Sequence, residues 1–316
     1  MSSRPLELFD LPKLTHFRNE IISLDCAQIL TCGNPLRAVN FLAHLNPTRR
    51  IYTAIHESEG DDELLGSIRQ QDGENFARLT YLATIGVAEP DVLPLIEHLI
   101  KQAKHWRAYQ VVAEIEEDSP LFQPLRQSGF SVYGRQRIWD LSDVALPDES
   151  PSYWRRAKDL DRISVQSLQR QLVPPLLQQV ESFDDPKRGL ICKNEELLAY
   201  VDALYGARGI FLRPLIHPNA DIVKEKLIGL LVRNIANRRQ RPIYFCVRSY
   251  QAWVEPILEE MEASVGPRMV VMVKHLINTQ RVEKSVPIGA DAAWANPAAP
   301  IQSSSKIEGK ESLSID

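Results

Sequence analysis

The sequence predicts an α/β protein of the α+β kind, built from two similar domains, each with a mixed, mostly antiparallel sheet flanked by helices. Three observations lead to this prediction. The chain has 316 residues, more than the roughly 100–200 residues of one ordinary domain. A Pro- and acid-rich break at 143–152 interrupts the apolar pattern. The same order of predicted elements occurs on both sides of this break, offset by roughly 132 residues.

The elements of the first half follow from apolar periodicity. Segments with strand-like alternation are 51–56, 64–69 and 77–84. A helix is predicted at 91–106, because apolar residues recur on one face. The compact apolar segment 110–115 predicts a strand, and a short helix after it ends at Gly129, a residue typical of helix C-termini. Segment 130–141 predicts one further strand or a pair of strands.

The second half repeats this order. Its predicted elements are strands at 197–204 and 209–215, a helix at 221–235, a strand at 243–247, a helix at 250–261 and a closing strand at 269–273. We therefore expect a duplicated domain, with copies at 1–142 and 153–278 joined by the linker 143–152. Residues 279–316 contain Ala, Ser, Pro and charges without apolar periodicity, a composition that predicts a disordered tail.

Composition favours a cytoplasmic protein that does not contact a membrane. No apolar run approaches the roughly 18 residues of a membrane helix. The first residues carry acids and lack an uninterrupted apolar segment, so no secretory signal is expected. The four cysteines have no paired metal-binding spacing, which argues against a metal site and fits a reducing compartment.

Charge is divided unevenly along the chain. Residues 1–150 hold 14 basic and 22 acidic side chains, and residues 151–278 hold 19 basic and 14 acidic ones. Two halves of opposite charge are expected to attract one another across an interface. The alternative is that the basic half binds a polyanion such as coenzyme A or, with less support, nucleic acid. The sequence does not indicate an oligomeric state.

Residues 118–133 carry a resemblance to a known family. A short helix there ends in the step Gly129-Phe130 and leads into a strand, and the helix 91–106 and strand 110–115 precede it at matching distances. This order is similar to the GNAT superfamily of acyl-CoA-dependent N-acyltransferases. The resemblance covers 15–141, and more loosely 153–276, so the whole chain looks like a tandem GNAT protein.

The resemblance implies a cofactor site for acetyl-CoA or another acyl-CoA. In this family two neighbouring strands splay apart, main-chain groups of one strand bind the pantetheine arm, and the next helix N-terminus binds the pyrophosphate. The family marks that turn with Q/R-x-x-G-x-G/A, and reading it from Ala83 puts Gly86 and Ala88 at the glycine positions. The cofactor-binding residues implied in this way are Leu82, Thr84, Ile85, Gly86 and Ala88, with Arg213 supplying the leading base of the second copy.

Acyl transfer to an amine needs a base for the amine and an acid for the departing thiolate. Glu114 and Glu116, at the end of strand 110–115, are the candidate bases; the alternative is a solvated acidic rim with the neighbouring acids. Tyr133 is the candidate acid; the alternative is a packed strand tyrosine with its hydroxyl outward. The family's own tyrosine position is Leu125 here.

Two functions therefore remain open. The first is an acyl-CoA-dependent N-acyltransferase acting on a small amine or a peptide amine. The second is a catalytically inactive tandem GNAT-fold binding or scaffold protein. The second function is favoured by Ala83, which stands in place of the motif's Gln or Arg, and by Leu125, which stands at the position of the family's tyrosine.

Overall fold

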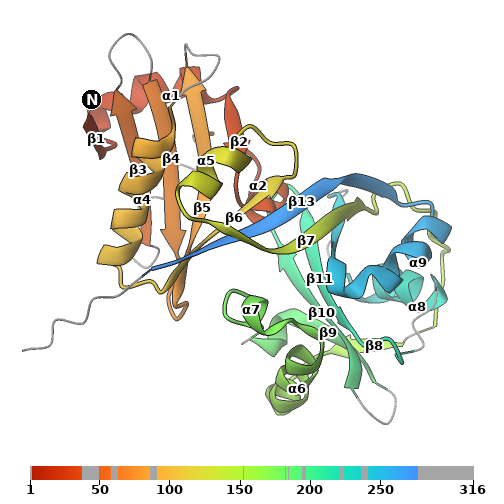
Figure 1. Cartoon of the computed structure of the whole chain (residues 1–316). Coiled ribbons are helices and arrows are strands. Elements are labelled where there is room, and N and C mark those ends of the chain that lie inside the picture. The colour runs from red at the N-terminus through yellow and green to blue at the C-terminus, as the bar shows by residue number, and fades with distance from the viewer. Residues whose placement is uncertain are drawn as a thin grey trace, which may run out of the picture. The chain divides into compact units, whose positions relative to one another are not determined.

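The computed structural model describes residues 2–37, 50–57, 63–85, 91–151, 153–181, 183, 185–193, 197–220, 224–235 and 241–276 (Figure 1). Residues 1–278 form one compact unit. The predicted tail, 279–316, lies outside the described residues. Within the described part of the chain, no helix is both long and apolar enough to cross a membrane.

The described strands form one large mixed sheet with two lobes, which confirms the predicted fold class. The first lobe contains β1 (Ser2–Pro5), β3 (Arg50–Glu57), β4 (Glu63–Gln70), β5 (Phe76–Ile85) and β6 (Gln110–Glu116), with the short β2 (Ile21–Ser23) paired to β5. The second lobe contains β8 (Trp154–Arg156), β9 (Gly189–Lys193), β10 (Leu197–Tyr205), β11 (Ile210–Ile216) and β12 (Ile243–Arg248). In each lobe the pairs are antiparallel except the last, β5 with β6 and β11 with β12.

Two long strands connect the lobes. β13 (Ser264–His275), near the C-terminal end of the described chain, lies between β6 and β7 (Ser131–Asp140), and β7 pairs on its other edge with β12 (Figure 1). Each lobe thus receives the last strand of the other. The segment 269–273, predicted to close the second copy, is part of β13 and pairs with β6 of the first lobe. The predicted boundaries at 142 and 153 stay a prediction.

Helices pack on both lobes. They are α1 (Leu14–Phe17), α2 (Cys26–Cys32), α4 (Leu93–His105), α5 (Phe122–Gln127), α6 (Arg162–Leu172), α7 (Pro175–Gln178), α8 (Lys224–Gly229) and α9 (Glu255–Glu260), with short 3-10 or π turns at η1 (Leu8–Lys13), η3 (Asp159–Asp161), η4 (Pro186–Arg188), η5 (Leu230–Asn234) and η6 (Ser249–Val254). The helix predicted at 250–261 is two pieces, η6 and α9, because Gln251 has a non-helical backbone (φ −130°, ψ 26°). The segment 130–141 is the single strand β7.

The apolar core of the first lobe depends on the end of the chain. Its buried residues come from β4, β5, α4 and β6, but Val270, Met272 and Leu276 belong to the same cluster. A separate core fills the second lobe under α8 and α9. A third apolar cluster joins Phe76 and Val112 of the first lobe to α6, α7 and β10 of the second. The two lobes therefore share buried surface as well as strands.

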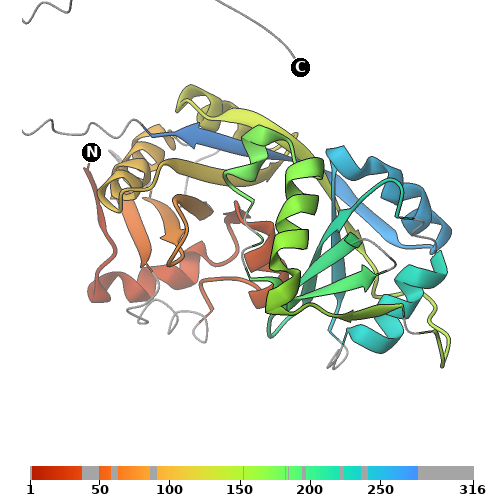
Figure 2. The ribbon, with the colours of Figure 1, turned by 90° about the horizontal axis from the view of Figure 1, so that it is seen from below.

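α2 of the first lobe packs against the turn between β10 and β11 (Figure 2). A Cβ atom at Gly206 would lie 2.1 Å from the main-chain oxygen of Thr31, so only glycine permits this approach. Nearby, the main-chain N–H of Arg208 donates to the same oxygen at 2.8 Å. The contact fixes α2 between the lobes.

A buried carboxyl group near the N-terminus makes stability depend on pH. Asp10 accepts hydrogen bonds from both terminal nitrogens of Arg4, at 2.6 and 2.8 Å, and from the Glu7 N–H at 2.9 Å. The hydrogen bond from Arg4 is the main cause that lowers the pKa of Asp10 to about 2 from the usual 3.8. Because the folded-state pKa is depressed, this stabilisation is complete above the unfolded pKa and is lost as the pH falls through about 2.

We expect Asp10→Asn to lower the unfolding free energy at neutral pH, and the loss to shrink to nothing as the pH falls from about 4 to about 2. Urea unfolding of both proteins across this pH range measures the difference. Asp118→Asn, at an exposed carboxyl that makes none of these bonds, is the control and should change little. A loss that is the same at pH 2 and pH 7 would show that Asp10 acts through packing and not through its charge.

Candidate functional site

The first lobe has the expected opening between two parallel strands. β5 and β6 pair at 76–78 and 110–112 and then diverge, while β5 continues to Ile85 and β6 to Glu116. Beyond these pairs, the main-chain N–H and C=O groups on the facing edges of β5 and β6 need other hydrogen-bond partners. In an empty opening of this kind, a ligand's amide groups would supply them.

The chain itself fills this opening. β2 pairs antiparallel with 81–83 on the edge of β5 that faces β6. The N–H of Leu24 then donates to the Thr80 oxygen at 2.9 Å, and the Leu24 oxygen accepts from the Glu114 N–H at 2.9 Å. Leu24 is 1% exposed and packs in the first core. The segment 21–24 thus bonds to the edges of both β5 and β6.

Asp25 holds that segment in place. Its carboxylate caps α2 by accepting from the Gln28 N–H at 3.1 Å, and it accepts two hydrogen bonds from Arg69, at 3.0 and 2.6 Å. Burial alone would raise the pKa of Asp25, but the charges of Arg69 and Arg78 outweigh it and lower the pKa. Asp25 therefore stays ionised and fixes the chain where it leaves the opening.

The start of α4 offers few donors for a phosphate. The N–H of Leu93 is taken by the Asp91 carboxylate at 3.1 Å, and Pro94 has no N–H. A carboxylate at this position also competes with any anion for the positive end of the helix. Gly86 and Ala88 lie outside the described residues.

The second lobe has the same opening and fills it with a side chain. β11 and β12 pair at 210–212 and 243–245 and then diverge. The amide of Gln251 bridges the free edge of β11: its oxygen accepts from the Ile216 N–H at 2.7 Å, and its nitrogen donates to the Pro214 oxygen at 2.9 Å. Gln251 is fully buried, and the break in η6 directs it inward. Its amide reproduces the hydrogen bonds of a missing strand.

The predicted cofactor residues of the first lobe lie along β5. Leu82 has its side chain in the first core and its main chain paired with β2. Thr84 is half-buried and pairs with Leu64 of β4, and Ile85 ends the strand opposite Glu63. The structure brings these residues to the lip of the opening, where β2 already occupies the edge at 81–83.

Arg213 lies elsewhere. Its side chain forms an ion pair with the fully buried Asp202 at 2.5 Å, and its guanidinium carbon lies 4.8 Å from the centre of the Phe183 ring. Burial opposes the charge, but Asp202 raises the pKa of Arg213 above its usual value. Arg213 therefore faces the space between the lobes, a place that the strand pattern did not predict.

The three predicted catalytic residues are not drawn together. Glu114 is buried and accepts from the Cys26 N–H at 3.2 Å and from Arg248 at 3.3 Å. Glu116 is exposed at the end of β6. The Tyr133 hydroxyl hydrogen-bonds the imidazole of His275. Among the described residues, no hydrogen bond or ion pair joins Tyr133 to either glutamate.

A buried ionic network joins the lobes behind the openings. Arg248 contacts Glu181 at 2.7 Å, Glu114 at 3.3 Å and the side-chain oxygen of Gln136. The Tyr250 hydroxyl donates to Glu181 at 2.9 Å, and both burial and the Glu181 charge raise the pKa of Tyr250. Burial opposes the charge of Arg248, but the two carboxylates raise its pKa. One arginine thus holds a carboxylate from each lobe.

A cleft of about 930 Å³ opens between the lobes in front of this network. Its walls come from α2, β4, β5, β10, β11 and η4. Six arginines line it: Arg69, Arg78, Arg162, Arg188, Arg213 and Arg248. Among these six, only Arg213 was a predicted site residue, because residues this far apart in the chain show no common spacing.

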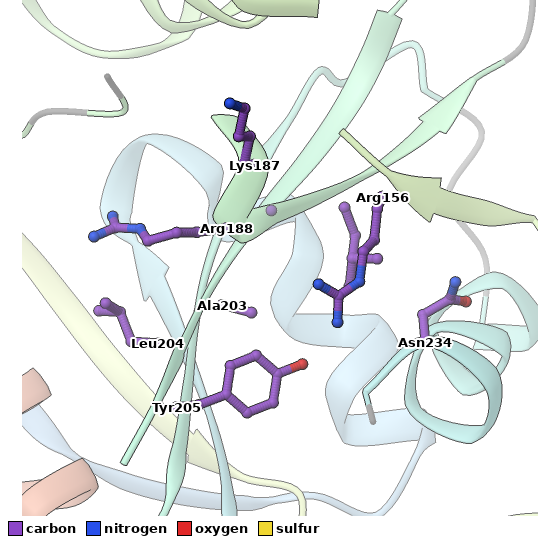
Figure 3. Close-up of a pocket in the computed structure, with 9 residues that line it drawn as sticks. Arg156, Lys187, Arg188, Ala203, Leu204, Tyr205 and Asn234 are labelled. Atoms are coloured by element: carbon purple, nitrogen blue, oxygen red, sulfur yellow. The ribbon is translucent and has the colours of Figure 1, made fainter. Parts of the chain in front are cut away.

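A smaller hollow of about 420 Å³ lies on the second lobe. Arg156, Lys187, Tyr205 and Asn234 line it, and Arg188 extends away from Arg156 there (Figure 3). Lys187 is paired with Asp159 at 3.0 Å. Arg188 lines both spaces. In the part of the chain that the structure describes, no three His, Cys, Asp or Glu side chains are placed to hold a metal ion.

The sequence matches no protein-family model, and no curated protein matches it. Solved structures do match. A tandem GNAT protein from the clavulanic acid biosynthesis pathway superposes with a TM-score of 0.50 over 87% of this chain and 98% of its own, at 13% identity. The chain has the tandem GNAT fold. The predicted resemblance is therefore confirmed for the fold.

Two further solved structures are similar to this chain over most of its length. A putative acetyltransferase from Pyrococcus horikoshii matches with a TM-score of 0.52 at 12% identity, over 89% of this chain and 91% of its own. A Drosophila melanogaster protein matches with a TM-score of 0.53 at 14% identity, over 88% and 99%. The assignment of a cofactor site to the openings beside β5 and β11 stays a prediction from the sequence resemblance.

The sequence did not predict three features of the candidate site: β2, Gln251 and Glu181. β2 is three residues long, too short for a detectable alternation. Gln251 is an ordinary polar residue in a helical pattern. Glu181 follows the four-residue α7, where no element was predicted. The one available signal was Arg248, a cation directly after the compact apolar strand 243–247.

Proposed function

We propose that this chain is a binding protein with the tandem GNAT fold, which takes its ligand in the cleft between the lobes and does not transfer acyl groups. The proposal rests on one observation: the protein's own residues occupy the two openings between diverging strands. The edge of β5 is occupied by β2 and Leu24, and the edge of β11 by the amide of Gln251. Both cofactor positions are filled by the protein's own residues.

Opening the first lobe would be costly. Withdrawing the segment 21–24 breaks the main-chain bonds of Leu24, each worth about 0.5–1.5 kcal/mol. Exposing the Leu24 side chain adds about 1.5–3 kcal/mol. Asp25 would also leave Arg69 and the α2 N-terminus, to which it is bonded. A pantetheine arm could replace the main-chain bonds but not the apolar contact or the cap.

The second candidate is an acyl-CoA-dependent N-acyltransferase acting on a small amine or a peptide amine. The splay of β5 from β6, and of β11 from β12, favours it, as does the named activity of the Pyrococcus horikoshii protein. It would use Glu114 or Glu116 as base and Tyr133 as acid. Acetyl-CoA or another acyl-CoA would contact Leu82, Thr84, Ile85, Gly86 and Ala88, or Arg213.

Acetyl-CoA binding separates the two candidates. A ligand at 100 times its dissociation constant stabilises a fold by about 2.7 kcal/mol, a shift that thermal unfolding detects readily. We expect no change in the unfolding midpoint of the wild-type protein at millimolar acetyl-CoA, nor with a longer acyl-CoA. Isothermal titration calorimetry should likewise give no heat above dilution.

Gln251→Ala provides the matched variant. It removes the amide that bridges Pro214 and Ile216 and leaves the edge of β11 open. The binding-protein proposal predicts that the wild type does not bind acetyl-CoA, whatever this variant does. Saturable binding to the wild type, with a gain of affinity in Gln251→Ala, would contradict the proposal, favour the second candidate and locate the cofactor in the second lobe.

A further inference from the structure

We propose that the cleft between the lobes binds a small dianion, with one anionic group at Arg78 and the other at Arg188. This inference rests on the proposed binding function and names its ligand class. It concerns a site other than the two openings beside β5 and β11. The ligand would contact both lobes, since Arg78 belongs to β5 and Arg188 to η4.

The inner carboxylates of the cleft already have cationic partners. Asp25 is bound by Arg69 through two hydrogen bonds, and Glu114 is bound by Arg248. Both carboxylates are buried. These pairs neutralise one another and leave no inner carboxylate for a cationic ligand.

Arg78 is less fully compensated: its charge helps to lower the pKa of Asp25, but Arg69 is the residue that hydrogen-bonds that carboxylate. The Arg78 guanidinium donates to the Val180 main-chain oxygen at 3.2 Å, and the guanidinium carbon lies 4.8 Å from the centre of the Phe76 ring. Among the described residues, no carboxylate forms an ion pair with it. A half-buried guanidinium carries five N–H donors, and a carbonyl satisfies only part of them. Arg78 therefore has charge and donors left for an anion.

Arg188 is only partly compensated. It donates two hydrogen bonds to Asp202, at 3.0 and 3.3 Å, but Arg213 shares that single carboxylate at the shorter distance of 2.5 Å, so two arginines have one carboxylate between them. The Arg188 side chain is 35% exposed and extends toward the space between the lobes. Arg162, exposed at the start of α6, adds a third cation at the same cleft.

The two cations converge on one segment. Val180 receives the hydrogen bond from Arg78, and Phe183 lies under Arg213, which shares Asp202 with Arg188. Arg78 and Arg188 both line the same cleft, so two anionic groups on one small molecule can engage the two arginines.

Acidic residues at the cleft edge do not reverse this charge pattern. Asp72 and Glu74 lie on the turn between β4 and β5, and Asp185 precedes η4. Asp72 and Asp185 are exposed, so water and salt screen them more strongly than the inner groups. Asp185 also accepts from the Lys187 N–H at 3.1 Å. A dianion bound at the inner arginines would lie behind these groups.

Isothermal titration calorimetry of the full chain tests the inference with succinate, inorganic phosphate, acetate and 1,4-diaminobutane. We expect succinate or phosphate to bind with a dissociation constant of about 1 mM or lower. Acetate should bind at least about tenfold more weakly, because it engages one arginine instead of two. Succinate should bind more tightly than phosphate, because it carries its charges on two separate groups and phosphate carries them on one. Tighter binding of phosphate would contradict the two-point arrangement. Binding of neither dianion, or preferential binding of the diamine, would overturn the inference.

Arg78→Gln is the decisive variant, since it removes the charge and keeps a polar side chain with hydrogen-bond donors. We expect it to weaken dianion binding about tenfold or more. Arg135→Gln, at an exposed arginine outside the cleft, is the matched control and should bind as the wild type does. Equal affinity in Arg78→Gln and wild type would contradict the inference.

If Arg78→Gln does not fold, Arg162→Gln replaces it, because Arg162 makes no hydrogen bond or ion pair to another described side chain. This variant should still weaken dianion binding by roughly two- to fivefold, since a charge at the cleft edge contributes less. The two proposals fail separately. Absent dianion binding without acetyl-CoA binding removes only the ligand class. Acetyl-CoA binding that Arg78→Gln leaves unchanged removes the proposed function, because the phosphates of acetyl-CoA then do not occupy the arginine cleft.

Discussion

Replacing Arg248 by leucine should lower the unfolding free energy by about 3–5 kcal/mol, the usual cost of removing one partner from a buried ion pair. Arg248 is 7% exposed and is the cation that holds Glu114 and Glu181. Without it, two carboxylates from different lobes would remain buried near one another. Chemical denaturation followed by circular dichroism measures the loss.

Two further variants separate the charge effect from lost packing. Adding Glu181→Gln to Arg248→Leu removes one of the two buried, uncompensated carboxylate charges and should recover part of the lost unfolding free energy. Arg135→Leu breaks the exposed pair with Glu117 and should cost at most about 1 kcal/mol. If Arg248→Leu were no more destabilising than Arg135→Leu, the network would not be what holds the lobes together.

A chain that ends at Ala263 should not fold its first lobe, although that lobe's own helices and strands are all present. The truncation removes β13, and with it Val270, Met272 and Leu276 from the first core. Burying three such side chains is worth roughly 5–9 kcal/mol, comparable to the whole stability of a typical domain. Near-ultraviolet circular dichroism and thermal unfolding should report no cooperative transition.

A chain ending at Asn278 is the matched control. It keeps β13 and removes only the segment outside the compact unit 1–278. We expect its unfolding midpoint to equal that of the full chain. A cooperative transition in the shorter chain, with native β-sheet signal from the first lobe, would mean that β6 and β7 can close without the exchanged strand.

The exchange of β13 between the lobes also holds the walls of the cleft in fixed positions. Because β7 and β13 cross from one lobe to the other, the strands that carry Arg78 and Arg213 belong to one continuous sheet, and Arg188 follows on η4. The contact of Gly206 with α2 and the Arg248 network add to this connection. Such a cleft has its cations placed before a ligand arrives, which lowers the ordering cost of binding.

The local elements were predictable because burial on one face leaves a period in the sequence. Segments 64–69, 77–84 and 110–115 are within β4, β5 and β6, and the helix predicted at 91–106 contains α4. Repetition of these periods gave the tandem arrangement and, through the Gly129-Phe130 step, the resemblance to the GNAT superfamily. The predicted site residues Glu114, Glu116 and Tyr133 were placed on the right strands, but their contacts could not be read from those strands.

By itself, then, the sequence determined the fold class and most strands and helices, since each element depends on residues within about ten positions of one another. The tandem arrangement could be predicted because the same order of elements occurs twice. Only the tertiary structure decided that β2 and Gln251 fill the two openings, that β13 completes the other lobe, and that Arg78 and Arg188 face one cleft. The physical reason is that apolar periodicity records which face of an element is buried. It does not record which distant edge, amide or charge that element meets.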